Sequence, residues 1–507
     1  MLDPQKKLDA PTLLLLGGII FWIALYAIIG PQTLGDDGFY FKDSGINLAI
    51  GKGLREVGTC GNPSLEYKYY ANYPPVYPFL YGLYVSVVGI GDYQNTYFNL
   101  LLHIAKAILI FMIVVRYGTD WTPNQKLIIT GILVLFLPSA NTYDRPEDLV
   151  IVLFLVSLLF YLQRQPEAVF LVAGLNLMTS PVCGSISAVI LLGIYFHDVF
   201  KEKVDWKIFS EKSYPVLYML VFPVIITAIL AFLDTSIFER FYDYVKYILV
   251  KGEGRPKGVY VKAVLSRGFF AVAPLLSFVL IVLLGLVASF SAYRALEKRL
   301  ALFMIAVIGM VIFLNWLGRA YYYQFFTVLG LTVGMYVMMK DVEKVREMRR
   351  KVFWVCLGII LLMTLPRTAR DIYVRLVPMS SERYKDAKEQ VKNFFKDKPD
   401  EFILSSYQYF FIVKSVKQKV VVDDLFSADE PNIPRYIVAI PTKKDSIITL
   451  TPKPRIFTPK VEKAFFYRKV FETEKSVPNP QNTFWERLLM RPQETWYPVI
   501  YERIDEQ

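Results

Sequence analysis

The sequence predicts an α-helical polytopic membrane protein with about eleven transmembrane helices and a small α/β domain at its C-terminal end. The first observation is composition: 54% of the 507 residues are hydrophobic and only 20% are charged, whereas soluble domains carry about a quarter charged residues. The second is that uncharged apolar blocks recur up to residue 367 and then stop. The third is that the basic clusters between these blocks can all lie on one side of a membrane.

The first apolar block predicts a membrane anchor. It runs without a charge from Ala10 to Gly35 and follows Lys6 and Lys7. A helix needs about 20 apolar residues to cross the hydrocarbon core of a bilayer. Because the block lacks a convincing A-x-A cleavage site, we expect it to be retained rather than removed as a signal peptide.

Later blocks predict the remaining helices, and one of them is ambiguous. Ala168–His197 could form one long helix or two short helices broken at Ser180–Gly184. Arg164 precedes this block and Lys201 follows it, so the block crosses twice if both flanks are cytoplasmic. Pro181 supplies the turn. The other blocks are Asn95–Val115, Leu127–Tyr143, Leu149–Gln163, Ser213–Leu233, Gly268–Tyr293, Leu300–Gly318, Ala320–Met339 and Val352–Pro366.

With about eleven transmembrane helices and cytoplasmic basic clusters, the N-terminus lies in the cytoplasm and the C-terminus outside, in a multi-pass protein of the plasma membrane. The transmembrane module is 1–367, and its first outer loop, 31–94, is the longest one within the module. The net charge of +12 is explained by Lys and Arg in cytoplasmic loops, so no nucleic-acid partner is expected.

Residues 368–507 predict a separate extracytoplasmic α/β domain, because charges return and the apolar segments become short. A helix is expected at Glu382–Lys396. The domain carries no recognisable motif, and it either binds the acceptor or covers the site. The expected strands are Phe402–Ser405, Val420–Val422, Tyr436–Ile440, Ile447–Leu450 and Val499–Tyr501.

Several kinds of site are excluded. Cys60, Cys183 and Cys356 form no CxxC pair, which excludes a zinc ribbon and a thioredoxin-like site. Two histidines are too few for a three-histidine zinc site. The sequence also lacks the G-x-S-x-G and H-E-x-x-H patterns of serine hydrolases and metalloproteases.

The first outer loop begins with two carboxylates, Asp36 and Asp37, where the chain leaves the bilayer. They are either a helix cap, for which Asp is a common residue, or acids that act on a substrate. Further along the loop, Tyr73–Pro78 is an aromatic, Pro-rich segment that we expect on the surface, entering a short interfacial helix.

Two further outer turns carry charges. Tyr143–Asp148 contains Asp144, Arg145 and Glu147, which form either a self-paired surface cluster or one wall of a site. Arg319 is followed by three tyrosines, and it either extends to lipid phosphates or clamps a substrate phosphate. Because helix bundles bring such turns together, we expect a polar cavity at the outer face of the membrane.

The order of these motifs resembles that of GT-C fold glycosyltransferases. The resemblance covers roughly residues 10–340 and is nearest to the protein O-mannosyltransferase, aminoarabinose transferase and arabinofuranosyltransferase branches. It rests on Asp36-Asp37, Tyr73-Pro74-Pro75-Val76-Tyr77-Pro78, Arg145-Pro146-Glu147 and Thr179-Ser180-Pro181, in that order.

The resemblance implies an inverting transferase that moves a sugar from a polyprenyl phosphate to a hydroxyl of a glycan, lipid or protein acceptor. Asp36 or Asp37 would be the general base. Arg319 would stabilise the charge of the leaving phosphate. The remaining substrate-binding residues implied are Lys68, Tyr73, Asp144, Arg145, Glu147 and Tyr322.

This chain departs from the family in two places. Tyr73 stands before the Pro-Pro pair, where aminoarabinose transferases have a lysine, and Lys68 is the nearest basic substitute. The turn Thr179-Ser180-Pro181 also lacks the lysine of the family's T-K-P-like turn. Because both lysines are missing, the residue that would make a second contact to the phosphate is left open.

No cofactor is predicted, although Asp36 and Asp144 could hold a divalent cation such as Mg²⁺ or Mn²⁺, as in relatives with pyrophosphate-linked donors. Two other functions stay open. One is a flippase or transporter for lipid-linked sugars, although such proteins favour charges near the membrane midplane. The other is a non-catalytic membrane scaffold.

Overall fold

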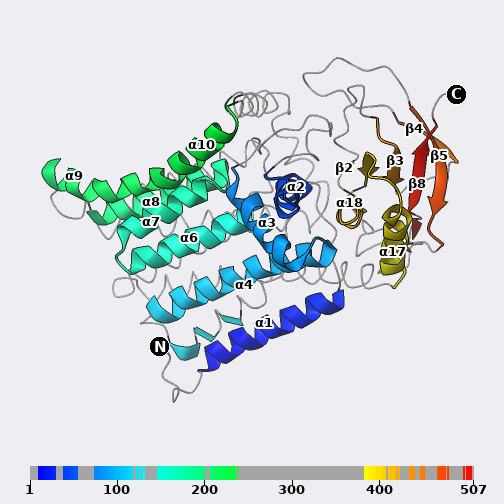
Figure 1. Cartoon of the computed structure of the whole chain (residues 1–507). Coiled ribbons are helices and arrows are strands. Elements are labelled where there is room, and N and C mark those ends of the chain that lie inside the picture. Colours follow the sequence, from blue (N-terminus) through cyan, green and yellow to red (C-terminus); the bar gives the residue numbers. More distant parts are fainter. Residues whose placement is uncertain are drawn as a thin grey trace, which may run out of the picture.

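The structure is a computed structural model with a helical part and a C-terminal α/β part (Figure 1). The structure describes residues 9–29, 38–54, 74–117, 146–199, 206–235, 382–406, 409–417, 419–422, 433–439, 446–450, 465–474, 477–478, 495–496 and 498–504. It also describes some residues between 122 and 131, and residues 238 and 242.

Helices that follow one another along the chain pack side by side in the helical part, so that α4 lies against α6, α6 against α7 and α7 against α8 (Figure 1). A 3₁₀ segment, η1, continues into α10. The elements are α1 (Ala10–Ile29), α2 (Gly38–Ala49), α3 (Val76–Val88), α4 (Asp92–Tyr117), α6 (Glu147–Leu162), α7 (Pro166–Leu177), α8 (Pro181–Val199), α9 (Trp206–Ser213), η1 (Tyr214–Leu220) and α10 (Val221–Leu233).

Helices α1, α4, α6, α7, α8 and α10 match apolar blocks of the sequence, and α3 is the short helix expected after the Pro-Pro pair. Helices α2 and α9 were not predicted, and the block Leu127–Tyr143 lies largely outside the described residues. The ambiguous block forms two helices, because α7 ends at Leu177 and α8 begins at Pro181. Among the described helices, Tyr93–Ile113 and Ser210–Leu233 are long and apolar enough to cross a membrane. The blocks predicted between 268 and 366 lie outside the described residues, so the count of about eleven stays a prediction.

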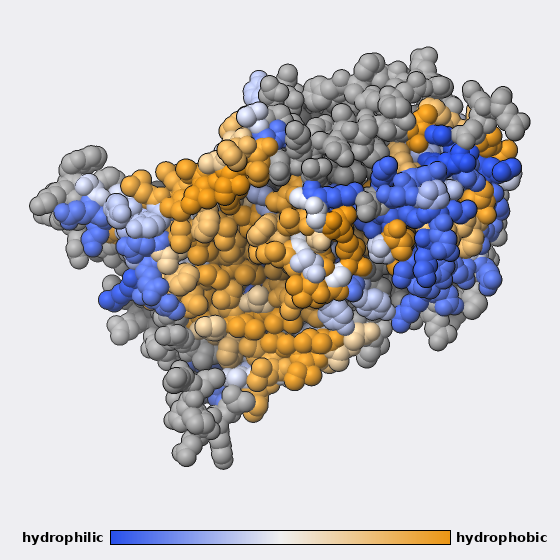
Figure 2. All heavy atoms as spheres, viewed as in Figure 1, coloured by the Kyte–Doolittle hydropathy of each residue, from blue (hydrophilic) through white to orange (hydrophobic). Residues whose placement is uncertain are grey.

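The face of the helical part that Figure 2 shows is largely apolar along the helices, with hydrophilic residues at one end. On α10, Phe232 is 91% exposed and Val224 is 61% exposed. Soluble monomers rarely expose contiguous apolar patches larger than a few hundred Å². The helical part is therefore suited to a lipid environment, and the α/β part, whose visible face is largely hydrophilic, is suited to water.

The C-terminal part contains a six-stranded mixed sheet with the strand order β2-β1-β3-β8-β5-β4. Strand β1 is parallel to β2 and β3, and the other pairs are antiparallel. The elements are α17 (Glu382–Lys396), β1 (Ile403–Ser405), α18 (Phe410–Lys414), β2 (Val420–Val422), β3 (Tyr436–Ala439), β4 (Ile447–Leu450), β5 (Phe465–Glu472), β6 (Val477–Pro478), β7 (Thr495–Trp496) and β8 (Val499–Arg503).

The predicted helix Glu382–Lys396 and all five predicted strands are confirmed. Three features of this part were not predicted: α18, strand β5, which lies between β8 and β4 in the sheet, and the short pair β6–β7. In β5, Phe465 and Tyr467 point into the core, whereas Phe466 and Arg468 are exposed. This alternation is the pattern of a sheet with one buried face.

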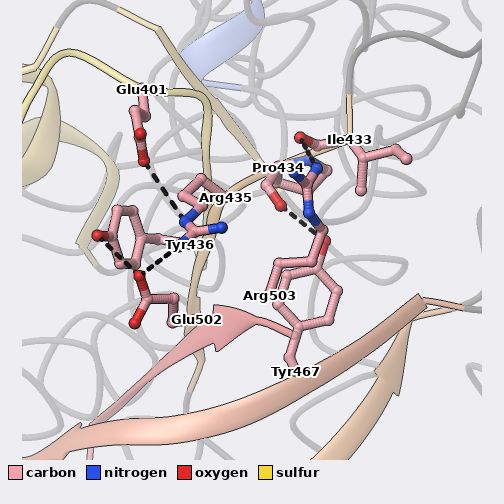
Figure 3. A network of polar contacts seen from close by, with 8 residues as sticks. All are labelled: Glu401, Ile433, Pro434, Arg435, Tyr436, Tyr467, Glu502 and Arg503. Atoms are coloured by element: carbon pink, nitrogen blue, oxygen red, sulfur yellow. Dashed lines mark hydrogen bonds and ion pairs between the residues drawn. The ribbon is translucent and has the colours of Figure 1, made fainter. Parts of the chain in front are cut away.

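A polar network ties the entry of β3 to β8 (Figure 3). The Arg435 guanidinium lies 3.0 Å from Oε1 of Glu502, and its Nε lies 3.8 Å from Oε2 of Glu401. The hydroxyl of Tyr436 donates to the same Glu502 oxygen at 3.3 Å. These groups are partly exposed, so the network aligns the strands rather than contributing much stability.

A buried hydrogen bond ties the same segment to β5 (Figure 3). The Tyr467 hydroxyl donates to the carbonyl of Pro434 at 2.8 Å. Burial raises the pKa of Tyr467 well above its usual value, so the phenol stays protonated and remains a donor.

The expectation of a surface segment at the start of α3 is wrong. Tyr77 and Tyr81 are fully buried. Both rings meet Phe98 of α4 edge to face, with centroid separations of 5.8 and 5.1 Å. Proline and tyrosine are common on surfaces, but here the aromatic rings fill the space between α3 and α4.

Helices α2 and α3 approach closely because each has a glycine at the contact. A Cβ atom on Gly45 would lie 2.5 Å from the carbonyl oxygen of Pro78 and 3.0 Å from the nitrogen of Gly82. Both of those atoms belong to the backbone of α3, so they cannot move aside without shifting the helix. The glycines therefore fix where α2 lies.

Replacing Gly45 by Ala should destabilise the protein. Overpacking of this kind costs about 1–3 kcal/mol, so a clear fall in the thermal midpoint in detergent is expected. The matched control is Gly17→Ala in α1, where an added Cβ meets nothing within 4 Å, so the midpoint should not fall. Equal midpoints for Gly45→Ala and the wild type would contradict the close approach.

Candidate functional site

Of the predicted site residues, Glu147 is the one that falls within the described residues. It is half-buried and lies in the first turn of α6, directly after Pro146. A carboxylate there is favoured by the positive end of the helix dipole. Outside the described residues lie Asp36, Asp37, Lys68, Tyr73, Asp144, Arg145, Arg319 and Tyr322.

The segments that adjoin these residues are described, and several of them meet. Helix α2 begins at Gly38, directly after the acidic pair, and α3 begins at Val76, directly after the Pro-Pro pair. Helix α6 begins at Glu147 within the charged turn. The turn between α7 and α8 is the Thr179-Ser180-Pro181 motif.

Hydrogen bonds join three of these segments. The backbone N–H of Val76, at the start of α3, donates to the carbonyl of Met178 at 3.2 Å. The side-chain amide of Asn176 donates to the carbonyl of Val150, in the first turn of α6, at 3.2 Å. The α7–α8 turn therefore contacts the starts of both α3 and α6.

Helix α2 joins the same assembly through its packing on α3. Gly45 lies against Pro78 and Gly82, and the ring of Phe41 meets the ring of Tyr77 edge to face at 6.3 Å. The described segments adjoining four motifs, which are far apart in the sequence, thus converge on one region of the structure (Figure 1).

The alternative of a self-paired surface cluster at Tyr143–Asp148 is wrong for Asp148. Its carboxylate is buried, and Oδ1 accepts a hydrogen bond from Nζ of Lys106, on α4, at 2.6 Å. Nε2 of His103 lies 4.0 Å from the other carboxylate oxygen. Asp148 is therefore turned into the bundle, where its charge is matched by a cation.

A second buried cation lies on α2. Nζ of Lys42 donates to Oδ1 of Asn99 at 3.2 Å and also to Oδ1 of Asn95. The same ammonium lies 5.0 Å from the ring centroid of Tyr81 and 5.8 Å from that of Phe98. Amide oxygens and aromatic faces together replace the water that a buried ammonium loses.

His103 and Lys106 lie within the block Asn95–Val115 that the sequence predicts to cross the membrane, whereas the buried positions of Lys42, Asn95 and Asn99 were not predicted. A signal was present, because Asn95, Asn99, His103 and Lys106 follow one another at steps of four, four and three residues. Such spacing lines one face of a helix. Polar residues on one face of an apolar helix point to the interior of a bundle.

The arrangement fixes helix positions rather than supplying reacting groups itself. Buried charges persist only where they are paired and hydrogen-bonded, and these pairs join α2 to α4 and α4 to α6. Within the described ranges, no group of three or more His, Cys, Asp or Glu side chains is placed to hold a metal ion.

A comparison with protein-family models and with curated proteins finds no match for this chain. Among solved structures, it resembles ArnT from Cupriavidus metallidurans in the apo state, with 15% identity, a TM-score of 0.49 and coverage of 85% of this chain and 94% of that chain. The same ArnT bound to undecaprenyl phosphate matches with 14% identity, a TM-score of 0.46 and coverage of 85% and 92%.

The oligosaccharyltransferase of Archaeoglobus fulgidus, in complex with Zn and sulfate, matches with 13% identity, a TM-score of 0.45 and coverage of 84% of this chain and 68% of that chain. Similarity of this degree concerns the path of the chain alone.

Removing one partner of the Lys106–Asp148 pair should destabilise the protein strongly. Lys106→Met leaves the Asp148 carboxylate buried without this cation, which costs about 3–5 kcal/mol. The double variant Lys106→Met, Asp148→Asn removes both charges and should recover part of that loss. Thermal unfolding of the two single variants and the double variant measures the coupling, and additive losses would contradict the pairing.

Proposed function

We propose that this protein is an integral-membrane, inverting glycosyltransferase of the GT-C type. It would transfer a sugar from a polyprenyl-phosphate donor to a hydroxyl of a glycan, lipid or protein acceptor on the outer face of the membrane. The observation that carries the proposal is the convergence of the segments adjoining four motifs: the starts of α2, α3 and α6 and the α7–α8 turn.

The convergence matters because the four motifs come from loops that the sequence places on one side of the membrane. The acidic pair ends directly before α2, and the charged turn ends in the first turn of α6. The residues preceding these helices therefore start from neighbouring points.

In the proposed reaction, Asp36 or Asp37 accepts the proton of the acceptor hydroxyl. The oxygen attacks the anomeric carbon from the face opposite the phosphate, so a new C–O bond forms with inversion. The bond from the anomeric carbon to the phosphate oxygen breaks, and polyprenyl phosphate leaves with the bonding electrons. A positioned base contributes about 10²–10⁴-fold to such a step.

The leaving phosphate needs a cation, and Arg319 supplies a permanently charged fork for its oxygens. Lys68 is the candidate for a second phosphate contact, and Tyr73, Arg145 and Tyr322 would bind substrate. Asp144 and Glu147 would shape a second wall of the site. Glu147 suits that role, since it is half-buried at the start of α6.

The proposed chemistry needs no resident cofactor, because the base and the phosphate cation are both side chains. A divalent cation held by Asp36 and Asp144 is the alternative. It would serve as the phosphate cation and make those carboxylates ligands. Treatment with EDTA followed by addition of Mg²⁺ or Mn²⁺ distinguishes the two.

The function is tested with purified protein and a panel of polyprenyl-phosphate sugars, by measuring the release of polyprenyl phosphate. Asp36→Asn and Asp37→Asn keep the size of the side chain and remove the base. Whichever of the two aspartates is the base, its Asn variant should turn over about 10²–10⁴-fold more slowly.

The matched control is Asp9→Asn, the same substitution at the opposite end of α1, where Asp9 caps the helix through the N–H of Thr12 at 3.0 Å. Asparagine also caps helices well, so Asp9→Asn should keep full turnover. Full turnover in both Asp36→Asn and Asp37→Asn would refute the assignment of the base. The absence of any released polyprenyl phosphate with wild-type protein would refute the proposed function.

A further inference from the structure

A buried ion pair joins the C-terminal part of the chain to α2. Nζ of Lys414, at the end of α18, lies 3.0 Å from Oδ1 of Asp43, and both side chains are completely buried. The two residues come from opposite ends of the sequence and from the two parts of the structure, so the pair connects the α/β part to the helical part.

The surroundings of this pair are largely apolar and shared by both parts, and the side-chain amide of Asn47 donates to Oδ2 of Asp43 at 3.5 Å. Phe41 and Ile46 of α2 belong to one core cluster with Phe410, Phe411 and Val413 of α18. In such surroundings two opposite charges attract strongly, and either charge alone is costly. The pair therefore allows one relative placement of α18 and α2 and penalises others.

Helix α2 is fixed on its other sides as well. Lys42 donates to Asn99 of α4, and Gly45 lies against the backbone of α3. Successive residues of a helix point about 100° apart. Lys42, Asp43 and Gly45 therefore hold α2 from three directions, and of these contacts Asp43–Lys414 is the one made to the C-terminal part.

We propose that Lys414 and Asp43 act as a positioning pair, through which the C-terminal part holds α2 and thereby sets the geometry of the acidic pair that directly precedes it. The inference rests on the proposed function, since it assigns a role in that reaction to residues that touch no substrate. It gives the C-terminal part a role in turnover rather than in acceptor binding alone.

The test combines turnover with hydrogen exchange, using the full-length protein in detergent or nanodiscs. In Lys414→Met, backbone amides of Gly38–Ala49 should exchange about tenfold faster or more, because the local opening of α2 becomes easier. The kcat for the polyprenyl-phosphate sugar should fall about 10²-fold, since a displacement near 1 Å has that effect. The KM should be unchanged.

Lys417→Met is the matched control. Lys417 is a buried lysine three residues further along, and its ammonium donates to the carbonyl of Lys398 within the C-terminal part. This variant should leave both the exchange of Gly38–Ala49 and the kcat unchanged. If it changes them as much as Lys414→Met does, the effect is a general loss of the C-terminal fold and the inference is overturned.

A second variant covers the case in which Lys414→Met does not fold. Asp43→Asn combined with Lys414→Gln removes both charges and leaves two amides that can bond to each other. This double variant should return α2 exchange and kcat to within about tenfold of the wild type. If it folds with wild-type stability but keeps fast exchange or a low kcat like a single variant, the pairing is refuted.

The exchange measurement separates this inference from the proposed function. If the wild type transfers no sugar but Lys414→Met still loosens α2 selectively, the proposed function fails and the connection between the two parts stands. If Lys414→Met exchanges at Gly38–Ala49 like the wild type, the positioning pair is refuted, whatever the turnover shows.

Discussion

Burying a charge in an apolar interior is the constraint on which the rest of this structure depends. Lys106 and Asp148 join α4 to α6, and Asp43 and Lys414 join α2 to α18. Each partner alone would carry a desolvation cost of several kcal/mol, so each helix is held where its charge is matched. The hydrophobic effect does not select these positions within lipid, because lipid tails are as apolar as the side chains.

The buried charge pairs help to hold together the starts of helices that are far apart in the sequence. Lys42 of α2 and Asp148 of α6 contact the polar face of α4, and the starts of α3 and α6 contact the segment between α7 and α8. An inverting transferase needs a general base, a phosphate cation and an acceptor pocket close to one another. Rigid helix starts are suited to holding these groups in place, because a small displacement of the reacting atoms lowers the reaction rate strongly.

The sequence predicts the long apolar helices and most of the strands, because their signals are local, but it does not predict α2, α9 or α18. The length of the apolar blocks and the charges beside them are enough to predict α1, α4 and α6 and the division of one block into α7 and α8. In the C-terminal part, α17 and five of the six strands of the larger sheet follow from short apolar runs.

Contacts between distant residues could not be predicted in the same way. Asp43 and Lys414 are ordinary charges in the sequence, and the structure is what brings them together. Tyr77 was expected on the surface, because nothing local shows that Phe98 of α4 lies opposite it. Strand β5 was missed although its residues alternate between the core and the surface.

The most direct measurement of the central claim is a cross-link between the first outer loop and the turn that carries Arg319. Cysteines replace Gly35 and Gly318, next to Asp36 and Arg319, in a protein whose native cysteines have been changed to serine. A short bis-maleimide reagent should join the two positions within one chain. Failure to cross-link, with both cysteines freely labelled by a single maleimide, would contradict a shared site.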